Sequence, residues 1–191
     1  MAANDSFNYL AVLFSIIIGL AATEMLQGLR ALLVARHRTQ LYWPALLRAA
    51  MLLLVLAQTW WATFGLRTEA VWTFAMYAAV LLHITLLYLV VALALPIPAE
   101  TGPVNMRALY FAHSRPAYAL LIATGLASIA KDVAIDSSLP EATNVAFHAV
   151  FIGLGLLAAV SRRDRVHQFV TLALFGLFVA YIVLLFDRLP G

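Results

Sequence analysis

The sequence predicts an all-α polytopic membrane protein in which six helices cross the bilayer. Of its 191 residues, 64% are hydrophobic and only 11% are charged, and the mean hydropathy is +0.95. A soluble domain typically carries about 25% charged residues. The apolar residues also form long blocks, which indicates that lipid surrounds much of the chain. We therefore expect one transmembrane domain over residues 1–191, with the lipid bilayer as its main partner.

Composition excludes several kinds of site. The chain has no cysteine, so it offers no disulfide, no thiolate nucleophile and no cysteine-based metal site. The net charge of +3 comes from basic residues in short turns, where membrane orientation explains them better than nucleic acid does. The N-terminus lacks a basic region before the first apolar block, so we expect a retained helix and not a cleaved signal.

The first three segments are bounded by charged turns and prolines. The first, 7–33, exceeds the roughly 20 residues that a crossing requires. Pro44 suits the first turn of the second segment, 43–66. The third, 71–95, is stopped by Pro96 and Pro98.

The last three segments follow the longest connection. Residues 105–115 in that connection suit either a short interfacial helix or an irregular loop. The fourth segment is then expected at 117–135, the fifth at 145–160 and the sixth at 169–186. The turn between the fourth and fifth is acidic and rich in helix breakers.

Six crossings place both termini on one side, and the charges indicate which side. The turns after the first, third and fifth segments, with the adjoining helix ends, hold nine of the twelve basic residues, whereas the opposite side holds only Arg67, Lys131 and Arg188. Basic turns favour the cytoplasm. We therefore expect both termini outside.

Glu24 is the one carboxylate well inside an apolar segment. On a helix it shares a face with Ala21, Gln27, Gly28 and Ala31, with Thr23 and Arg30 at the edge. A carboxylate facing lipid is costly, so this face is expected to point inward.

Two interpretations of Glu24 stay open. It is either an ion or proton site surrounded by Thr23, Gln27, Arg30 and Arg48, or the ion-pair partner of Arg48 that locks the first hairpin.

Two further groups are candidates. Lys131, Asp132 and His148 should meet at the outer rim, because the fourth and fifth segments form a hairpin; the rim is either an extracellular vestibule or a solvated helix end. His83 lies near mid-membrane, where a lone histidine usually bonds a neighbouring carbonyl or hydroxyl. The different depths of His83 and His148 disfavour a haem, so no cofactor is expected.

Two stretches carry a family resemblance. SIIIGLAATEMLQGLRALL and YWPALLRAAMLLLVLAQTWWATFGL resemble the opening hairpin of small, uncharacterised bacterial inner-membrane proteins. The resemblance implies a six-helix protein of a bacterial plasma membrane. It implies no activity and no functional residue.

These observations favour transport over catalysis. The chain has no metalloprotease, serine hydrolase or nucleotide-binding motif, so we expect neither an enzyme nor a metal site. The leading hypothesis is a channel or transporter that passes an ion, a proton or a small polar solute. Because six short helices enclose little interior, we also expect a homo-oligomer. The alternative is a non-transporting scaffold or sensor subunit whose polar residues only specify packing.

Overall fold

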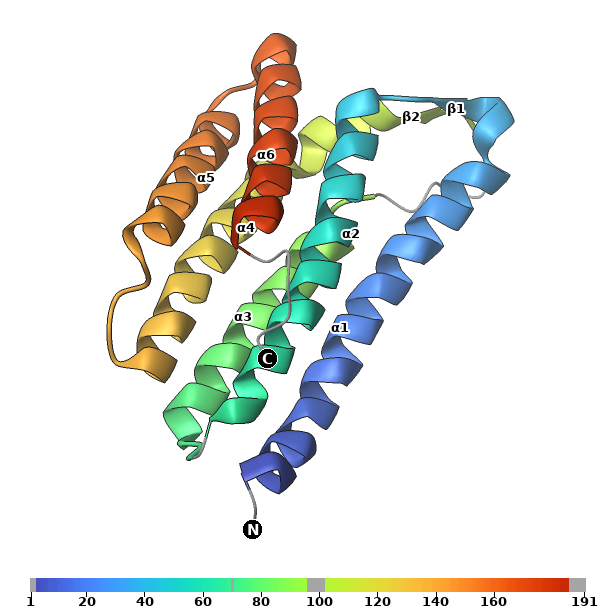
Figure 1. Cartoon of the computed structure of the whole chain (residues 1–191). Helices are drawn as coiled ribbons and strands as arrows, with labels where there is room; N and C mark the ends of the chain where they lie inside the picture. Colours follow the sequence, from blue (N-terminus) through green and yellow to red (C-terminus); the bar gives the residue numbers. More distant parts are fainter. Residues whose placement is uncertain (1–2, 70, 96–101, 186–191) are drawn as a thin grey trace.

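The computed structural model describes residues 3–69, 71–95 and 102–185, and this part of the chain is built almost entirely of helices (Figure 1). Six of them are long and apolar enough to span a membrane, as the sequence predicts. They are α1 (Ala3–Val34), α2 (Trp43–Thr63), α3 (Phe74–Ala92), α4 (Met106–Asp136), α5 (Ala142–Val160) and α6 (Asp164–Leu185).

Local capping explains several helix ends. Pro44 lies in the first turn of α2, where its missing N–H leaves no bond unmade. The side chain of Thr73 caps α3 by accepting from the Met76 amide, and that of Asn105 caps α4 by accepting from the Ala108 amide at 3.0 Å. These side chains satisfy amides that the first helical turn leaves without partners.

The fourth helix is longer than predicted. Residues 105–115 are neither a separate interfacial helix nor an irregular loop, because α4 runs without a break from Met106 past Pro116 to Asp136. Proline removes one backbone bond and usually ends or kinks a helix. Here Tyr110 and Tyr118, on either side of Pro116, are both buried, and both rings lie against Arg48 of α2 and His167 of α6. Tertiary packing therefore holds the two halves of α4 together.

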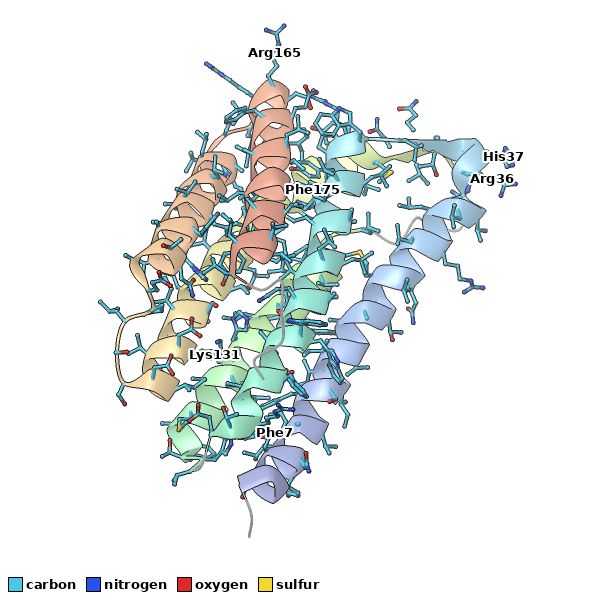
Figure 2. The ribbon with its side chains drawn as sticks, in the orientation of Figure 1. Phe7, Arg36, His37, Lys131, Arg165 and Phe175 are labelled. Atoms are coloured by element: carbon cyan, nitrogen blue, oxygen red, sulfur yellow. The ribbon has the colours of Figure 1, made fainter. Side chains whose placement is uncertain are left out.

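The two ends of the bundle differ in charge. At one end, called the basic end, the 3₁₀ helix η1 (Arg36–Arg38) and strand β1 (Thr39–Gln40) follow α1, and β1 pairs in parallel with β2 (Val104–Asn105) just before α4. Arg36, His37 and Arg165 lie at this end (Figure 2). The opposite, acidic end carries the 3₁₀ helix η2 (Phe64–Thr68), after α2, and the turn between α4 and α5.

Helix neighbours do not follow chain order. Helix α3 packs against α1 and α4, α5 packs between α4 and α6, and α2 packs against α6. The core between them is apolar and aromatic, and its largest fully buried side chains include Tyr110, Tyr118, Phe14 and Met25. This order brings α2 and the C-terminal helices together around one interior space.

The buried face of α1 is apolar, so the expected inward polar face is corrected. Its buried positions recur at heptad-like spacing and are Phe14, Ile18, Ala21, Met25, Gly28 and Leu32. Thr23, Gln27 and Arg30 are exposed on this chain, and Glu24 is half-buried at the edge of the interface. Close packing explains why the apolar face of α1 is the buried one. A Cβ added to Gly28 would lie 2.8 Å from the Cβ of Leu95, just beyond α3. Polar side chains at these contact positions would hold the helices apart.

Candidate functional site: a pocket at the acidic end

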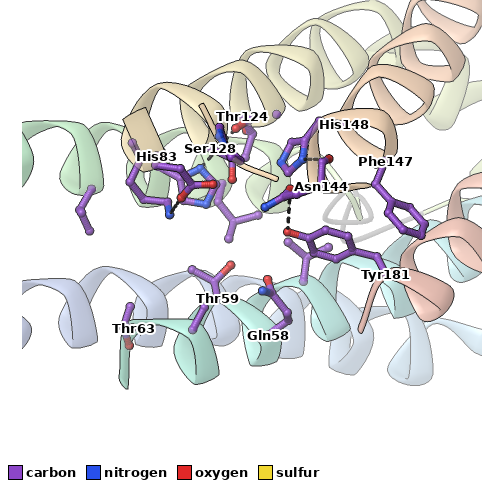
Figure 3. Close-up of a pocket in the computed structure, with 18 of the residues that line it drawn as sticks. Gln58, Thr59, Thr63, His83, Thr124, Ser128, Asn144, Phe147, His148 and Tyr181 are labelled. Atoms are coloured by element: carbon purple, nitrogen blue, oxygen red, sulfur yellow. Dashed lines mark hydrogen bonds and ion pairs between the residues drawn. The ribbon is translucent and has the colours of Figure 1, made fainter. Parts of the chain in front are cut away.

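A pocket of about 450 Å³ lies between α2, α3, α4, α5 and α6 (Figure 3). This volume falls in the range of small-molecule sites, which is roughly 300–1,000 Å³. No α1 residue lines the pocket among the parts of the chain that the structure describes. The pocket therefore lies away from α1, the helix that carries Glu24.

Carboxylates surround the outer part of the pocket. Its lining includes Glu69, Asp132, Asp136 and Glu141, with Lys131 as the one cationic side chain. Lys131 forms an ion pair with Asp132, and both side chains are half-buried. Within the described ranges, Glu69, Asp136 and Glu141 form no ion pair. The outer part thus carries an excess of negative charge.

Uncharged polar side chains line the middle of the pocket. Gln58, Thr59 and Thr63 project from α2 and face His83, Thr124 and Ser128 of α3 and α4 across the space (Figure 3). On the side of α5 and α6, the pocket is lined by His148, Asn144 and Tyr181.

Hydrogen bonds fix three of these groups. His148 donates from Nδ1 to the Asn144 carbonyl at 3.0 Å, and the Tyr181 hydroxyl lies 3.5 Å from the Asn144 side-chain oxygen. His83 bonds the Thr124 carbonyl through Nδ1 at 3.3 Å. The bond from His83 to the Thr124 carbonyl is of the kind that the sequence analysis describes for a lone histidine near mid-membrane.

The bond of His83 determines what the rest of its ring can do. A carbonyl oxygen only accepts, so Nδ1 carries the proton and Nε2 of the neutral ring is an acceptor. Nε2 has no hydrogen-bond partner among the residues described, although the side chain is only 9% exposed and lines the pocket. The pocket therefore contains an acceptor that a bound molecule can use.

Apolar side chains close the inner end of the pocket. They come from three helices and include Val55, Ile84, Leu87 and Leu121. Leu121 precedes Asp136 by fifteen residues on α4, which places it about 22 Å deeper along the helix. Leu121 also lines a second hollow of about 10 Å³, together with Arg48 and Tyr118.

Arg48 lies beside this hollow and not beside Glu24. It is 4% exposed, donates from Nη2 to the Ala94 carbonyl at 3.2 Å, and places its guanidinium 4.3 Å from the centroid of the Tyr110 ring. Its Nε and Nη1 are buried and have no hydrogen-bond partner among the described residues. No ion pair joins Arg48 to Glu24 in the same set. The locked hairpin proposed from sequence is therefore corrected: α1 packs through its apolar face, and Arg48 points toward α3 and α4.

A polar network at the basic end was missed by the sequence analysis. Asp164, at the start of α6, accepts from the Tyr42 hydroxyl at 2.7 Å, from Arg107 Nε at 3.2 Å and from Gln168 Nε2 at 2.8 Å. Burial and then the bond to Asp164 raise the pKa of the Tyr42 phenol, so the phenol stays protonated and donates. A signal existed in the sequence, because Asp164 is the single acid in a basic turn.

A buried chain of hydrogen bonds lies next to this network. The Tyr110 hydroxyl bonds Tyr118 at 2.8 Å and His167 Nδ1 at 3.1 Å, and His167 Nε2 bonds the Ser161 carbonyl at 3.0 Å. Because that carbonyl only accepts, Nε2 carries the proton and Nδ1 of the neutral ring accepts from Tyr110. These bonds tie α4 to the start of α6.

The structure thus brings some predicted site residues together and separates others. Lys131, Asp132, His148 and His83 line one pocket, whereas Glu24 and Arg48 do not. Lys131, Asp132 and His148 are half-buried, and whether they form a vestibule or a solvated helix end stays a prediction. Pocket residues that the sequence analysis did not assign to a site include Gln58, Thr59, Asn144, Tyr181 and Glu69.

Fold and site together define a multi-pass membrane protein with a polar pocket inside an apolar helical bundle. Among the described residues, no group of three His, Asp or Glu side chains is placed to hold a metal ion. No protein-family model, curated protein or solved structure matches the chain.

Proposed function

We propose that the protein takes a small polar solute into the pocket from the acidic end and passes it across a bacterial inner membrane. The observation that carries this proposal is the pocket itself, because polar side chains inside a bundle are costly unless they serve a path or a site. This proposal replaces Glu24 with the pocket as the solute site. It involves no bond-making chemistry.

The charge distribution supports an orientation with the acidic end outside. The sequence places nine basic residues in or next to the turns of the basic end and three toward the other end. Positive turns are retained in the cytoplasm. A cysteine introduced at the exposed Ser138 should react with an impermeant thiol reagent added to whole cells, and reaction only after permeabilisation would reverse the orientation.

The apolar inner end supplies a barrier to passage. Leu121, Leu87 and Ile84 stand between the polar lining and the Arg48 hollow, and apolar constrictions exclude water and ions. Passage then requires that these side chains separate while the outer part closes. Helix α4 carries both Leu121 and the rim pair, so its movement would couple the two ends.

The exposed polar positions of α1 support a homo-oligomer. Glu24 lies about 6 Å from the middle of the span Ser6–Val34, well inside a hydrocarbon layer whose half-thickness is about 15 Å. With Gln27 one turn away, it presents polar groups that no described residue of the same chain satisfies. We propose that α1 of a second copy covers this face, with the Gln27 amide of one chain donating to Glu24 of the other.

A second candidate is a sensor subunit that binds the solute without passing it. The apolar inner end favours this candidate, because Leu121, Leu87 and Ile84 lie between the polar lining and the Arg48 hollow. Both candidates require solute entry from the acidic end.

Cysteine labelling tests that shared requirement directly. The native chain has no cysteine, so Ser128→Cys places a single thiol in the middle of the pocket. The folded variant should react with a small charged methanethiosulfonate, whereas Ala127→Cys, on the adjacent buried position outside the pocket lining, should not. Equal protection of both thiols would contradict the proposed function.

A further inference from the structure

We infer that the solute is an organic ammonium ion, a cation that carries at least one N–H donor on an apolar body. This inference rests on the proposed function of the pocket and names the class of molecule that the pocket takes. Three independent features of the lining carry it: its charge, its free acceptor and its apolar depth.

The charge of the lining favours a cation. Four carboxylates face one lysine, and Lys131 is already offset by Asp132. The other cation described at this end, Arg67, is not a lining residue, and its guanidinium lies 3.8 Å from the Phe64 ring centroid. A cleft of one sign between low-dielectric walls concentrates ions of the opposite sign. An anionic solute would meet three unpaired carboxylates before any free cation.

The buried acceptor favours a cation with an N–H group. Nε2 of His83 is without a partner in the described residues, in a side chain that is 91% buried (9% exposed) and lines the pocket. The bond from Nδ1 to Thr124 makes Nε2 an acceptor. An ammonium N–H satisfies it, and a quaternary ammonium does not.

The apolar and aromatic part of the lining favours an apolar body and disfavours a bare metal ion. Phe147, Phe151, Phe178 and Tyr181 line the pocket on the side of α5 and α6, and aromatic faces attract alkylammonium groups as well as apolar groups. A metal ion needs several oxygen or nitrogen ligands gathered at short range. The described residues offer no such cluster of His, Asp and Glu.

Three thiol reagents of similar length test the inference in the purified full-length protein. Ser128→Cys is treated with aminoethyl, trimethylammonioethyl and sulfonatoethyl methanethiosulfonate, and each rate is divided by the rate with 2-mercaptoethanol in solution. The normalised rate of the aminoethyl reagent should exceed that of the sulfonate by about tenfold or more. Equal rates, or a faster sulfonate, would overturn the cation class while leaving the pocket in place.

The negative charge of the lining and the acceptor of His83 are then tested separately. Replacing Glu69, Asp136 and Glu141 by their amides should remove most of the preference for cations, and Glu24→Gln, the same change outside the pocket, should leave it intact. His83→Leu should reduce the preference for the aminoethyl over the trimethylammonio reagent. An unchanged preference would overturn the N–H requirement. No reaction with any reagent would contradict the proposed function itself.

Discussion

The guanidinium of Arg48 lies 4.3 Å from the centroid of the Tyr110 ring, in the half of the bundle nearer the basic end. This contact joins α2 to α4 and takes the place of the ion pair with Glu24 that the order of the chain suggests. Cation–π contacts contribute about 2 kcal/mol or more when both groups are desolvated. Arg48 is therefore part of the core packing, and Glu24 belongs to a different surface.

The separation of these two residues gives the first prediction. Glu24→Gln and Arg48→Gln should change the free energy of unfolding additively, within about 0.3–0.5 kcal/mol, because no hydrogen bond or ion pair joins the two residues in the part of the chain that the structure describes. Unfolding of the single and double variants in detergent measures this coupling. A double variant that recovers much of the unfolding free energy lost in the single variants would show that Glu24 and Arg48 form an ion pair after all.

The close approach of α1 to the end of α3 gives a matched pair of glycine variants. Gly28→Ala should destabilise the protein by about 1–3 kcal/mol, because the new Cβ would meet the Cβ of Leu95 at 2.8 Å. Gly19→Ala, with no atom within 4 Å of the new Cβ, should be neutral or stabilising by up to about 1 kcal/mol. Thermal unfolding compares them, and equal effects would show that α1 does not pack on Leu95.

Tyr42 should make the stability sensitive to alkaline pH. Its folded pKa is raised above the ordinary value of 10.0, so its contribution is complete below that pH and is lost as the pH rises through and beyond it. Tyr42→Phe should lower stability by about 1 kcal/mol at neutral pH, because the hydrogen bond to the half-buried Asp164 is lost. Melting curves from about pH 8 to about pH 11 should show a shallower alkaline decline in the variant than in the native protein. Parallel curves would contradict the role of Tyr42.

The exposed polar face of α1 predicts the contact between copies. Gln27→Leu should shift the purified protein toward monomer, while Leu33→Ala, an exposed position on the same helix that points away from Glu24 and Gln27, should not. Light scattering in detergent measures the mass. An unchanged oligomer with Gln27→Leu, or a native protein that is already monomeric, would contradict the interface.

The sequence predicts the six helices well because long apolar blocks leave no other way to satisfy the backbone in lipid. It does not predict the continuity of α4, because Pro116 ordinarily signals a helix end, whereas Tyr110 and Tyr118 on either side of it pack against α2 and α6. It also misplaces the inward face of α1. Ala21 and Gly28 belong both to the polar stripe and to the buried apolar stripe, and helix periodicity alone does not choose between them.

The candidate site is predicted in part. A simple hairpin between α4 and α5 is enough to bring Lys131, Asp132 and His148 to one rim. The contributions of Gln58 and Tyr181 depend on α2 packing beside α6, and that neighbour relationship is not encoded in hydropathy or in turn lengths. The pocket thus requires the three-dimensional order of the helices.

The most direct test of the proposed transport function is the reactivity of a thiol at Leu121. This residue lines both the inner end of the pocket and the Arg48 hollow, so passage of a solute must expose it to each side in turn. Leu121→Cys in sealed vesicles of either orientation should react with impermeant trimethylammonioethyl methanethiosulfonate from both sides, while Ser138→Cys reacts from the acidic-end side alone. Reaction of Leu121→Cys from the acidic-end side alone would contradict transport and identify a binding subunit.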